Sequence, residues 1–365
     1  RSMTVGAGMV LTSAQQHAAA QGFLLPLDMG SRAQATIGGM VATNAGGYQV
    51  VRYGMTRDSV LGLEAVLPDG TVVRAMNRML KNNAGFDVKQ LFIGSEGLLG
   101  VVTRVVLRLR ARQDAAQTAL LALAGDDAVP QLLRTLERGL GGQLTSFGIM
   151  GADYDQFVRE HSKQLVSPLA PGFPSYVIVE ATGSDATRDR AHFARVLEDA
   201  RRQGLLATAS IARDEEERAE IWALREQAGG GFPKLGPLWA YDVSLPVGDM
   251  ASYGRRVKQE VTAAYPGARL LLLGHVGDGN LHLVAAPGSR DPAVKREVDD
   301  IVYAAVRDVG GSVSAEHGIG LEKLGYLAWS RTPEEIALMR ALKRTMDPLG
   351  ILNPGKMLAT IDEPR

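Results

Sequence analysis

Two histidines stand on either side of a glycine-rich turn and could share a metal ion. Between His275 and His282 lies Asp278-Gly279, a dipeptide that favours the two-residue loop of a β-hairpin. With that loop, the two histidines become direct cross-strand neighbours whose Cβ atoms lie about 4.5–5.5 Å apart. Two imidazoles at such a separation can bind one divalent metal ion. The pattern supports two interpretations equally well. One is a metal site, and the other is a pair of polar residues on a solvated strand face.

A second glycine-bracketed turn, residues 314–320, adds a carboxylate and another histidine. Three of the six histidines fall between positions 275 and 317, and the chain has no cysteine. Histidine and glutamate are then the natural ligands for zinc, manganese or iron, so Glu316 can complete a two-histidine site. His317 could act as a general base beside a metal-bound hydroxyl group. A supporting or capping role for His317 is the alternative.

The composition excludes several other classes of protein. Lys and Arg total 40, as do Asp and Glu, so the basic excess of a nucleic-acid binder is missing. Without cysteine there are no disulfides, iron–sulfur clusters, thiolate zinc sites or cysteine nucleophiles. The sequence shows no apolar run near the roughly 20 residues of a membrane-spanning helix, and no signal peptide opens it. We therefore expect a cytoplasmic protein, with peripheral membrane association left open.

Clustered glycines near the N-terminus suggest a backbone that approaches a ligand closely. Residues 26–30 precede a run of small residues at 36–47, and residues 94–100 form a third glycine-rich loop. Paired glycines in such segments are expected to leave backbone N–H groups open to a phosphate or to a flat ring. The segments match neither the dinucleotide-binding Gly-x-Gly-x-x-Gly pattern nor the Walker A loop. Tight structural turns are the alternative for each segment.

The elements that must position these residues are predicted from hydrophobic periodicity. Strands are expected at residues 61–67, 72–75 and 101–110, before a polar stretch at 110–117 without a clear strand pattern. From residue 118 to 309, strands alternate with amphipathic helices, which favours an α+β domain with an antiparallel sheet. A last helix over 334–346 ends at Asp347-Pro348. The expected domains are residues 1–112, 113–325 and 326–365.

Together these segments resemble one family, the flavin-dependent D-2-hydroxyacid dehydrogenases of the vanillyl-alcohol-oxidase fold type. That family contains D-lactate, glycolate and D-2-hydroxyglutarate dehydrogenases, and its motifs occur here in the family's order over nearly the whole chain. The matching segments are residues 26–30, 36–39, 44–47, 52–54, 94–97, 274–282, 314–320 and 347–356. The resemblance implies an α+β fold with a PCMH-type FAD-binding domain and an antiparallel-sheet substrate (cap) domain. It also implies a C-terminal segment that returns to the FAD-binding domain.

The resemblance implies a role for each motif. A D-2-hydroxyacid would be oxidised to the 2-oxoacid by hydride transfer to FAD, with electrons passing to a protein or quinone acceptor. Zinc or manganese would be bound by His275, His282 and Glu316, while His317 takes the hydroxyl proton. Arg225 would pair with the substrate carboxylate, since its guanidinium fork matches that group. From the sequence alone, without the resemblance, Arg225 is interpreted as an arginine on a helix surface. The residues expected to bind FAD are Pro26, Asp28, Gly30, Thr36, Ile37, Gly38, Gly39, Ala42, Asn44, Gly46, Gly47, Glu96, Gly97, Val102, Asn353 and Lys356.

Two positions depart from the pattern of family members that act on D-2-hydroxyglutarate. Those members carry a lysine where this chain has Ala240, and an asparagine where it has Val284. Both changes remove polar groups that could bind a second carboxylate. We therefore expect a monocarboxylate such as D-lactate, a longer D-2-hydroxyacid or D-mandelate.

The resemblance further implies that an N-terminal subdomain of the family is absent from this sequence. Its Arg-Gly-Gly-type loop wraps the FAD pyrophosphate and would precede the strand at residues 2–8. An FAD-binding domain that is incomplete at the N-terminus could bind FAD poorly. Two other functions therefore compete with the flavoenzyme, which ranks first. One is a metal-dependent hydrolase that activates water, and the other is a non-catalytic remnant that binds a metal or a hydroxyacid. A homodimer is compatible with all three.

Overall fold

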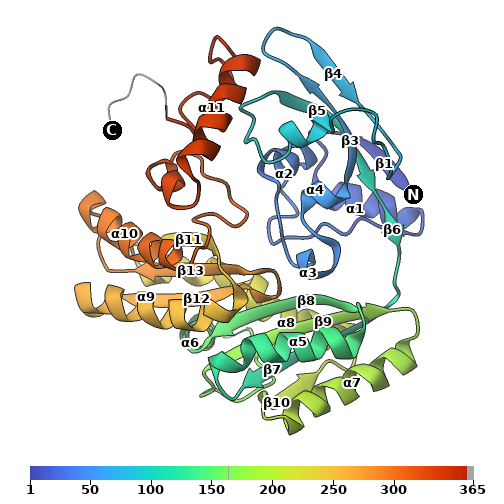
Figure 1. Cartoon of the computed structure of the whole chain (residues 1–365). Coiled ribbons are helices and arrows are strands. Elements are labelled where there is room, and N and C mark those ends of the chain that lie inside the picture. Colours follow the sequence, from blue (N-terminus) through green and yellow to red (C-terminus); the bar gives the residue numbers. More distant parts are fainter. Residues whose placement is uncertain (163, 360–365) are drawn as a thin grey trace. The chain divides into compact units, whose positions relative to one another are not determined.

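The computed structural model of the chain describes residues 1–162 and 164–359, which form two compact units (Figure 1). The first unit contains Arg1–Gln49, Tyr53–Arg112 and Val313–Arg365, and the second contains Val50–Arg52 and Gln113–Ser312. Over the described residues, no helix is both long enough and apolar enough to cross a lipid bilayer. The two units are described separately below.

The first unit is built on a four-stranded antiparallel sheet. The strand order is β1-β5-β3-β4, and a separate two-stranded ladder joins β2 to β6. The strands are β1 (Ser2–Gly6), β2 (Phe23–Leu24), β3 (Val60–Val66), β4 (Val72–Ala75), β5 (Val101–Arg108) and β6 (Arg110–Ala111). The helices of its N-terminal half are α1 (Leu11–Ala20), α2 (Ile37–Thr43), α4 (Thr56–Ser59) and the 3-10 helix η1 (Val88–Leu91). The residues of α3 (Val50–Tyr53) are divided between the two units.

The C-terminal segment belongs to the first unit. After the 3-10 helix η6 (Leu324–Trp329), α11 (Pro333–Met346) begins with a capping box at Thr332. Ile336, Met339 and Leu342 of α11 pack against the apolar core of this unit. Burial of these side chains stabilises the docked helix by the ordinary hydrophobic effect. The predicted return of the C-terminal segment to the FAD-type domain is therefore confirmed.

The second unit contains a seven-stranded antiparallel sheet with the order β10-β7-β9-β8-β12-β13-β11. The predicted α+β domain with an antiparallel sheet is thus confirmed. The strands are β7 (Ala115–Leu123), β8 (Leu144–Gly151), β9 (Ser175–Gly183), β10 (Leu206–Ile211), β11 (Trp239–Ser244), β12 (Arg269–His275) and β13 (Asn280–Ala286). Since successive side chains of a strand point to opposite faces, this sheet presents two different surfaces.

One face of this sheet is covered by α6 (Ala152–His161), α8 (Glu215–Glu226) and the 3-10 helix η3 (Ala228–Leu235). Tyr154, Phe157 and Leu224 from these helices share a core with Ile178 and Leu271 of the strands. Burial of large aromatic side chains here fixes α6 and α8 on the sheet. We call this surface the histidine face, because it also carries the histidines of β12 and β13.

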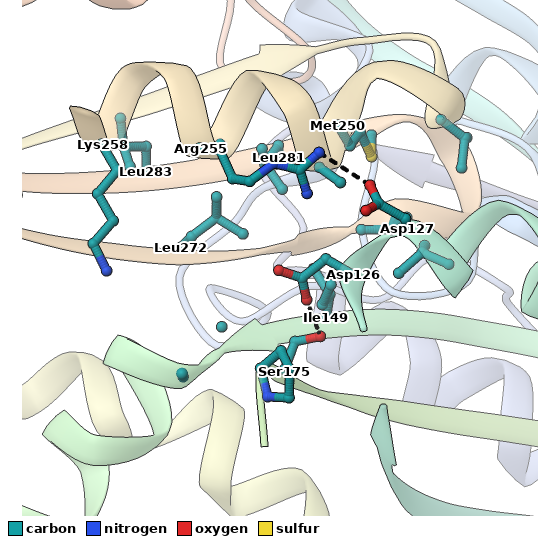
Figure 2. A pocket seen from close by; sticks show the side chains of 18 of the residues that line it. Asp126, Asp127, Ile149, Ser175, Met250, Arg255, Lys258, Leu272, Leu281 and Leu283 are labelled. Carbon is teal, nitrogen blue, oxygen red and sulfur yellow. Dashed lines mark hydrogen bonds and ion pairs between the residues drawn. The ribbon is translucent and has the colours of Figure 1, made fainter. Parts of the chain in front are cut away.

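The opposite face is covered by four helices and two short 3-10 turns. They are α5 (Val129–Leu140), α7 (Ala186–Arg202), α9 (Met250–Ala264), α10 (Pro292–Asp308), η2 (Asp126–Ala128) and η4 (Val247–Asp249). Leu272 of β12 and Leu281 and Leu283 of β13 lie beneath α9 (Figure 2). α10 is anchored to β11 by a 2.7 Å hydrogen bond from the Tyr241 hydroxyl to Asp299. This arrangement leaves a pocket between α5 and α9 on this face.

Candidate active site

The hairpin that joins β12 to β13 differs in register from the sequence prediction. His275 lies opposite Asn280, and His282 lies opposite Leu273. The loop is four residues long, because the 3-10 helix η5 (Val276–Asp278) precedes Gly279, which has a φ of 89°. The prediction of a two-residue Asp278-Gly279 loop with directly opposed histidines was therefore wrong. The two imidazoles are diagonal neighbours instead, with ring centroids 5.5 Å apart and nearly perpendicular planes.

Arg225 is buried against His275, and the alternative of a helix-surface arginine does not hold. It extends from α8, and its Nη2 donates a 3.1 Å hydrogen bond to Nε2 of His275. A guanidinium has no acceptor, so Nε2 accepts this bond and a neutral His275 carries its proton on Nδ1. The Arg225 Nη1 lies 3.4 Å from the carbonyl oxygen of Ile149. A guanidinium fork held this way within a protein interior is suited to a carboxylate.

Asp242 and Asn280 join the histidines, although sequence reasoning singled out neither residue. The Asp242 carboxylate is 1% exposed, and its Oδ1 accepts a 2.7 Å bond from the Asn280 side-chain amide. Nδ1 of His282 lies 3.7 Å from the same oxygen. The amide Oδ1 of Asn280 is buried and has no hydrogen-bond partner among the described residues. An aspartate between apolar neighbours in β11 was the sequence signal that could have indicated a buried acidic group.

This donor set fits a divalent metal ion in part. Asp242 and His282 each offer a ligand atom close to the other, and carboxylate with imidazole suits zinc or manganese. The orphaned Asn280 oxygen is a further acceptor that a cation could satisfy. His275 could ligate through Nε2 only after Arg225 turned away from that nitrogen. The residues of the second unit therefore offer two ready metal ligands and one that is engaged with a cationic side chain.

Asp278, in the turn after His275, has a carboxyl pKa far from its ordinary value. Burial of its carboxyl raises the pKa of Asp278 to about 7, although Arg225 and the backbone N–H of Asn280 counteract part of that effect. Near pH 7 the protonated and ionised forms of this carboxyl therefore coexist. Groups of this kind gather at functional sites more often than elsewhere.

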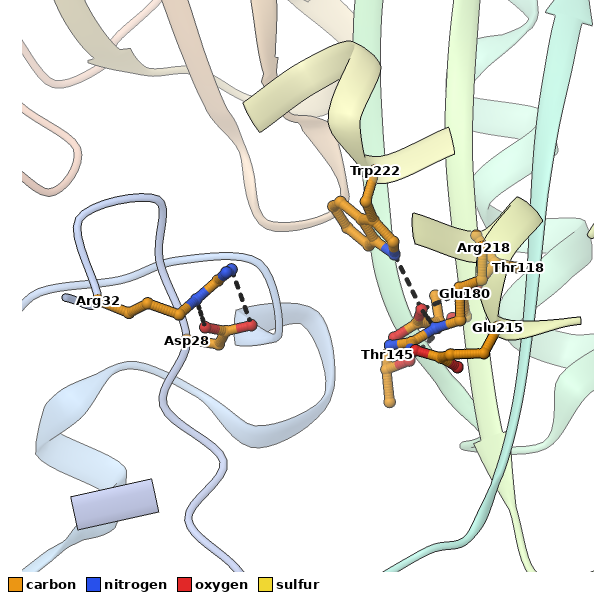
Figure 3. Close-up of polar contacts among 8 residues, drawn as sticks. All are labelled: Asp28, Arg32, Thr118, Thr145, Glu180, Glu215, Arg218 and Trp222. Atoms are coloured by element: carbon orange, nitrogen blue, oxygen red, sulfur yellow. Dashed lines mark hydrogen bonds and ion pairs between the residues drawn. The ribbon is translucent and has the colours of Figure 1, made fainter. Parts of the chain in front are cut away.

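A buried carboxylate on β9 holds α8, the helix that carries Arg225. Oε2 of Glu180 accepts hydrogen bonds from Thr118 at 2.8 Å, Arg218 at 2.9 Å and Trp222 at 2.9 Å (Figure 3). Arg218, Trp222 and Arg225 recur at helical spacing, so they share the face of α8 that meets the sheet. The Glu180 cluster thereby fixes the rotation of α8 about its axis.

In the first unit, residues 37–43 of the small-residue segment form a helix rather than an open loop. α2 begins after Thr36, whose hydroxyl accepts a 3.2 Å bond from the Gly39 N–H. The Gly38 N–H donates to the Ala7 carbonyl at 2.7 Å, and the Gly94 N–H donates to Val41 at 2.9 Å. These three N–H groups are therefore not open to a phosphate, and that part of the prediction was wrong. The physical reason is that helix formation and close packing already use the donors.

Glycine at position 47 brings two predicted cofactor segments together. A Cβ at Gly47 would lie 1.9 Å from the Asp28 carbonyl oxygen, and the next residue, Tyr48, donates its N–H to that same oxygen. Only glycine allows this approach. Asp28 also pairs with Arg32 through bonds of 2.6 and 3.3 Å (Figure 3). Residues 26–30 and 44–48 are therefore neighbours, while Pro26 is buried and Gly30 is exposed.

Glu96 links the third glycine loop to the turn that carries Glu316 and His317. Its carboxylate accepts hydrogen bonds from the backbone N–H groups of Ile319 at 2.7 Å and Gly320 at 2.9 Å. A Cβ at Gly318 would meet this carboxylate at 2.6 Å, which explains the glycine there. The side chain of Glu96, predicted to contact FAD, thus positions the 314–320 turn.

The remaining predicted residues of the first unit lie close to that turn or to the sheet. Oε1 of Glu316 lies 3.8 Å from Nε2 of the exposed His317. The Asn353 side chain donates to the Glu96 carbonyl at 2.5 Å, while Lys356 is half-buried nearby in sequence. Val102 pairs with Ala65 across β5 and β3. The other predicted cofactor residues are Ile37 and Gly46, both buried, and Ala42, Asn44 and Gly97, all half-buried.

In the first unit, the small residues of α2 and three left-handed backbone positions are the features that suit FAD. In α2, Gly39 is exposed and Gly38, Ala42 and Thr43 are half-buried. Small residues let a flat ring approach the backbone within van der Waals contact. Asn44 and Glu96 have φ values of 50° and 52°, and Asn353 has 44°, so three predicted cofactor residues adopt the left-handed conformation. Strained residues of this type cluster at ligand sites.

Comparison with known proteins agrees with this arrangement. The model of the C-terminal domain of FAD linked oxidases matches residues 112–357, and that of an FAD binding domain matches residues 1–76. The D-2-hydroxyglutarate dehydrogenase of Xanthomonas citri pv. viticola is 36% identical over 369 residues, covering 100% of this chain and 77% of that protein. The mitochondrial D-2-hydroxyglutarate dehydrogenase of Rattus norvegicus is 39% identical over 352 residues. This chain spans 65% of the length of the rat protein, and the match covers 96% of this chain.

Solved structures support the fold class. p-Cresol methylhydroxylase superposes with a TM-score of 0.75 at 15% identity, covering 100% of this chain and 77% of that one. Alkyldihydroxyacetonephosphate synthase gives a TM-score of 0.71 at 18% identity, covering 97% and 64%. The predicted vanillyl-alcohol-oxidase/PCMH-type fold is confirmed by these neighbours. With both units and the C-terminal segment matched, the chain belongs to the family of FAD-linked oxidases and is a relative of the D-2-hydroxyglutarate dehydrogenases.

Proposed function

We propose that this chain is an FAD-linked dehydrogenase that oxidises a D-2-hydroxyacid to the 2-oxoacid. The observation that carries the proposal is the buried Arg225 guanidinium on Nε2 of His275, beside His282 and Asp242. A carboxylate-binding fork beside metal-ligand side chains matches a substrate with a carboxylate and an adjacent hydroxyl. Relatives named D-2-hydroxyglutarate dehydrogenase support the same reaction type.

In the proposed reaction, each unit has its own task. The first unit carries FAD, which accepts the hydride from C2 when bound, and the second unit binds the substrate carboxylate through Arg225. The predicted domain limits at residues 112 and 325 remain predictions about this division of tasks. The electrons then leave for a protein or quinone acceptor, which is also a prediction.

His317 is the proposed base. Its Nε2 would take the hydroxyl proton, and Oε1 of Glu316 at 3.8 Å would stabilise the imidazolium that forms. Because His317 is exposed, its ring can reach a substrate without breaking core packing. A neutral imidazole and a substrate hydroxyl of lowered pKa make this transfer efficient.

The proposed metal ligands are His275, His282 and Glu316, now joined by Asp242. A divalent ion such as zinc or manganese would lower the pKa of the substrate hydroxyl. Binding through His275 requires that Arg225 leaves Nε2, and a substrate carboxylate would provide Arg225 with a new partner. Metal and substrate would therefore favour each other's binding.

We propose that the substrate is a monocarboxylate such as D-lactate, a longer D-2-hydroxyacid or D-mandelate. Ala240 and Val284 are cross-strand partners, two residues along the ladder of β11 and β13 from the partners Asp242 and His282. Side chains two residues apart on a strand share a face, so both positions adjoin the metal-ligand pair. Val284 is buried in the apolar core, and neither residue can bind a second carboxylate.

An anaerobic flavin titration tests the proposal. The purified protein, supplied with FAD, is mixed with D-lactate, D-mandelate and D-2-hydroxyglutarate, and flavin bleaching is followed. Bleaching by the first two, faster than by the third, is the expected result. A flavin that no D-2-hydroxyacid reduces would overturn the proposed reaction, and clearly faster bleaching by D-2-hydroxyglutarate would overturn only the substrate preference.

Ala240→Lys sharpens the substrate test. Ala240 is exposed on the edge strand β11, so a lysine can be accommodated there without disturbing the core. The variant is expected to raise kcat/KM for D-2-hydroxyglutarate relative to D-lactate, because an ammonium group can pair with a second carboxylate. An unchanged ratio would mean that this position does not face the substrate tail.

A further inference from the structure

The second unit contains a pocket of about 440 Å³ on the face of the sheet opposite the histidine face. It lies between α5 and α9, over β8, β12 and β13 (Figure 2). Its floor is apolar, and Ile149, Leu270, Leu272, Leu281 and Leu283 contribute to it. A volume of this size falls in the range of small-molecule sites, roughly 300–1,000 Å³.

The pocket is separated from the proposed active site by the thickness of the sheet. Leu281 and Leu283 of β13 line it, while His282, between them, points to the other face. On β12, Leu270 and Leu272 line the pocket, while Leu271 belongs to the core of the histidine face. None of the residues proposed to bind metal or substrate lines this pocket.

Small residues on α9 keep the pocket open. Ala251 and Gly254 line it from the helix, and Gly151 lines it from β8. A Cβ at Gly254 would approach the Leu272 side chain to 2.8 Å, so a larger residue there would fill the space. An apolar ligand could therefore contact the floor and the helix backbone at once.

Two exposed ion pairs cross the mouth of the pocket. Arg255 of α9 pairs with Asp127 at 3.0 Å, and Lys258 of α9 pairs with Asp153 at 2.5 Å. All four side chains are at least 45% exposed. Exposed pairs of this kind contribute about 0–1 kcal/mol each, so a ligand can displace them at small cost. Their charges cancel, and the net charge of the mouth is set by the remaining carboxylate.

That carboxylate is Asp126. Its Oδ1 accepts a 2.7 Å hydrogen bond from the Ser175 hydroxyl, and it has no ion-pair partner within residues 1–162 and 164–359. It is half-buried and lies between α9 and the strand that carries Ser175 (Figure 2). A carboxylate with an unpaired charge beside an apolar floor attracts a cation and repels an anion.

We propose that this pocket binds a small amphipathic amine, whose apolar body lies on the leucine floor and whose protonated amino group pairs with Asp126. The apolar lining selects for an aliphatic or aromatic body, and Asp126 selects for the charge of the head. The site is independent of the proposed dehydrogenase reaction, since it uses none of the same residues.

Three probes of matched shape test the proposal by isothermal titration of the FAD-supplied full chain. They are 4-phenylbutylamine, 4-phenylbutan-1-ol and 4-phenylbutyrate, which differ only in the head group. The amine is expected to bind about tenfold or more tightly than the alcohol, as a charge-assisted hydrogen bond implies, and the carboxylate most weakly. Equal affinities of amine and carboxylate, or no binding of the amine at millimolar concentration, would overturn the proposal.

Two variants locate the site. Asp126→Asn should reduce the amine affinity to that of the alcohol and leave the alcohol affinity unchanged. Ala251→Trp should abolish binding of all three probes, whereas Ala263→Trp, on an exposed position of the same helix, should not. Thermal unfolding of each variant establishes that it is folded. Amine binding that survives both Asp126→Asn and Ala251→Trp would place it elsewhere and overturn the assignment.

Discussion

Glu96 in the first unit and Glu180 in the second each anchor a segment that carries a predicted site residue, but their donors differ in kind. Glu96 accepts from the backbone N–H groups of residues 319 and 320. Glu180 accepts from the side chains of Thr118, Arg218 and Trp222. Backbone N–H donors remain when the side chains of residues 319 and 320 change. The Glu180 cluster, in contrast, depends on the side chains of Thr118, Arg218 and Trp222. The two anchors should therefore respond differently to mutation.

The largest effect is expected at Glu180, because its removal leaves several donors behind in the interior. Glu180→Ala should lower the free energy of unfolding by about 4 kcal/mol, as for a broken buried ion pair. Glu180→Gln keeps one acceptor and should cost about half as much. Urea unfolding followed by circular dichroism measures both values.

The matched control is Glu198→Ala, which breaks the exposed pair with Arg201 on α7 and should leave the free energy of unfolding nearly unchanged. A Glu180→Ala variant as stable as this control would show that Arg218 and Trp222 find other partners. It would then remove the distinction drawn between the two anchors.

Asp278 sharpens the comparison, since the donors around its carboxyl compensate its burial only in part. Its pKa is raised from 3.8 to about 7 by burial, a difference of about 3 units. The folded state therefore holds a proton that the unfolded state has released between pH 4 and pH 7, and stability falls as the pH rises through that window. The loss should be complete above pH 7 and amount to about 4 kcal/mol, because one pKa unit corresponds to about 1.4 kcal/mol.

Asp278→Asn should remove most of this pH dependence. Stability curves of the two proteins should converge near pH 4, and the variant should be the more stable one at pH 8. Chemical denaturation at pH 4, 6 and 8 measures the difference. A wild-type protein whose stability relative to the variant rises with pH in this range would show that the carboxyl is stabilised as an anion.

Glu96 tests the backbone-donor anchor and should show a smaller effect. Glu96→Ala removes two acceptors and retains a side chain at φ 52°, so a cost of about 2 kcal/mol is expected. Glu96→Gly loses the same hydrogen bonds, but glycine adopts the left-handed conformation without steric strain. The glycine variant should therefore be about 1 kcal/mol more stable than the alanine variant. Thermal unfolding of the pair measures this difference, and the opposite order would contradict the positional argument.

Features that depend on local sequence were predicted, whereas features that depend on distant side chains were not. The strand and helix pattern of residues 118–309 identified the antiparallel sheet, because period-2 and period-3.6 patterns survive in single sequences. β8 was missed, since Leu144–Gly151 mixes Ser and Gly with apolar residues and every position but the last is buried. An element buried on both faces shows no alternation.

At the candidate site, the sequence predicted a turn but not its geometry. The Asp278-Gly279 dipeptide located the turn, but η5 lengthened the loop and moved the histidines from opposite to diagonal positions. The burial of Arg225 was missed, since it depends on strands distant in sequence. Gly38 and Gly39 were predicted to bind FAD, yet their N–H groups donate to Ala7 and Thr36. Donor use depends on tertiary contacts that a spacing pattern does not contain.

The smallest effect is expected at the Asp28–Arg32 pair, where an anchor is partly exposed and its donor is a neighbour on the same chain segment. The Arg32 side chain is 32% exposed, and its guanidinium lies 5.7 Å from the centre of the Tyr48 ring. Arg32→Ala should lower the free energy of unfolding by less than about 1 kcal/mol, because water replaces most of what the pair supplies. Arg32→Lys should recover the charge but not the two-bonded geometry. An Arg32→Ala variant that lost as much free energy of unfolding as Glu180→Ala in the same urea series would contradict this ranking. Exposure to solvent would then not explain why some ion pairs stabilise the fold less than others. The cation–π contact with Tyr48 would have to contribute as much as the buried Glu180 cluster.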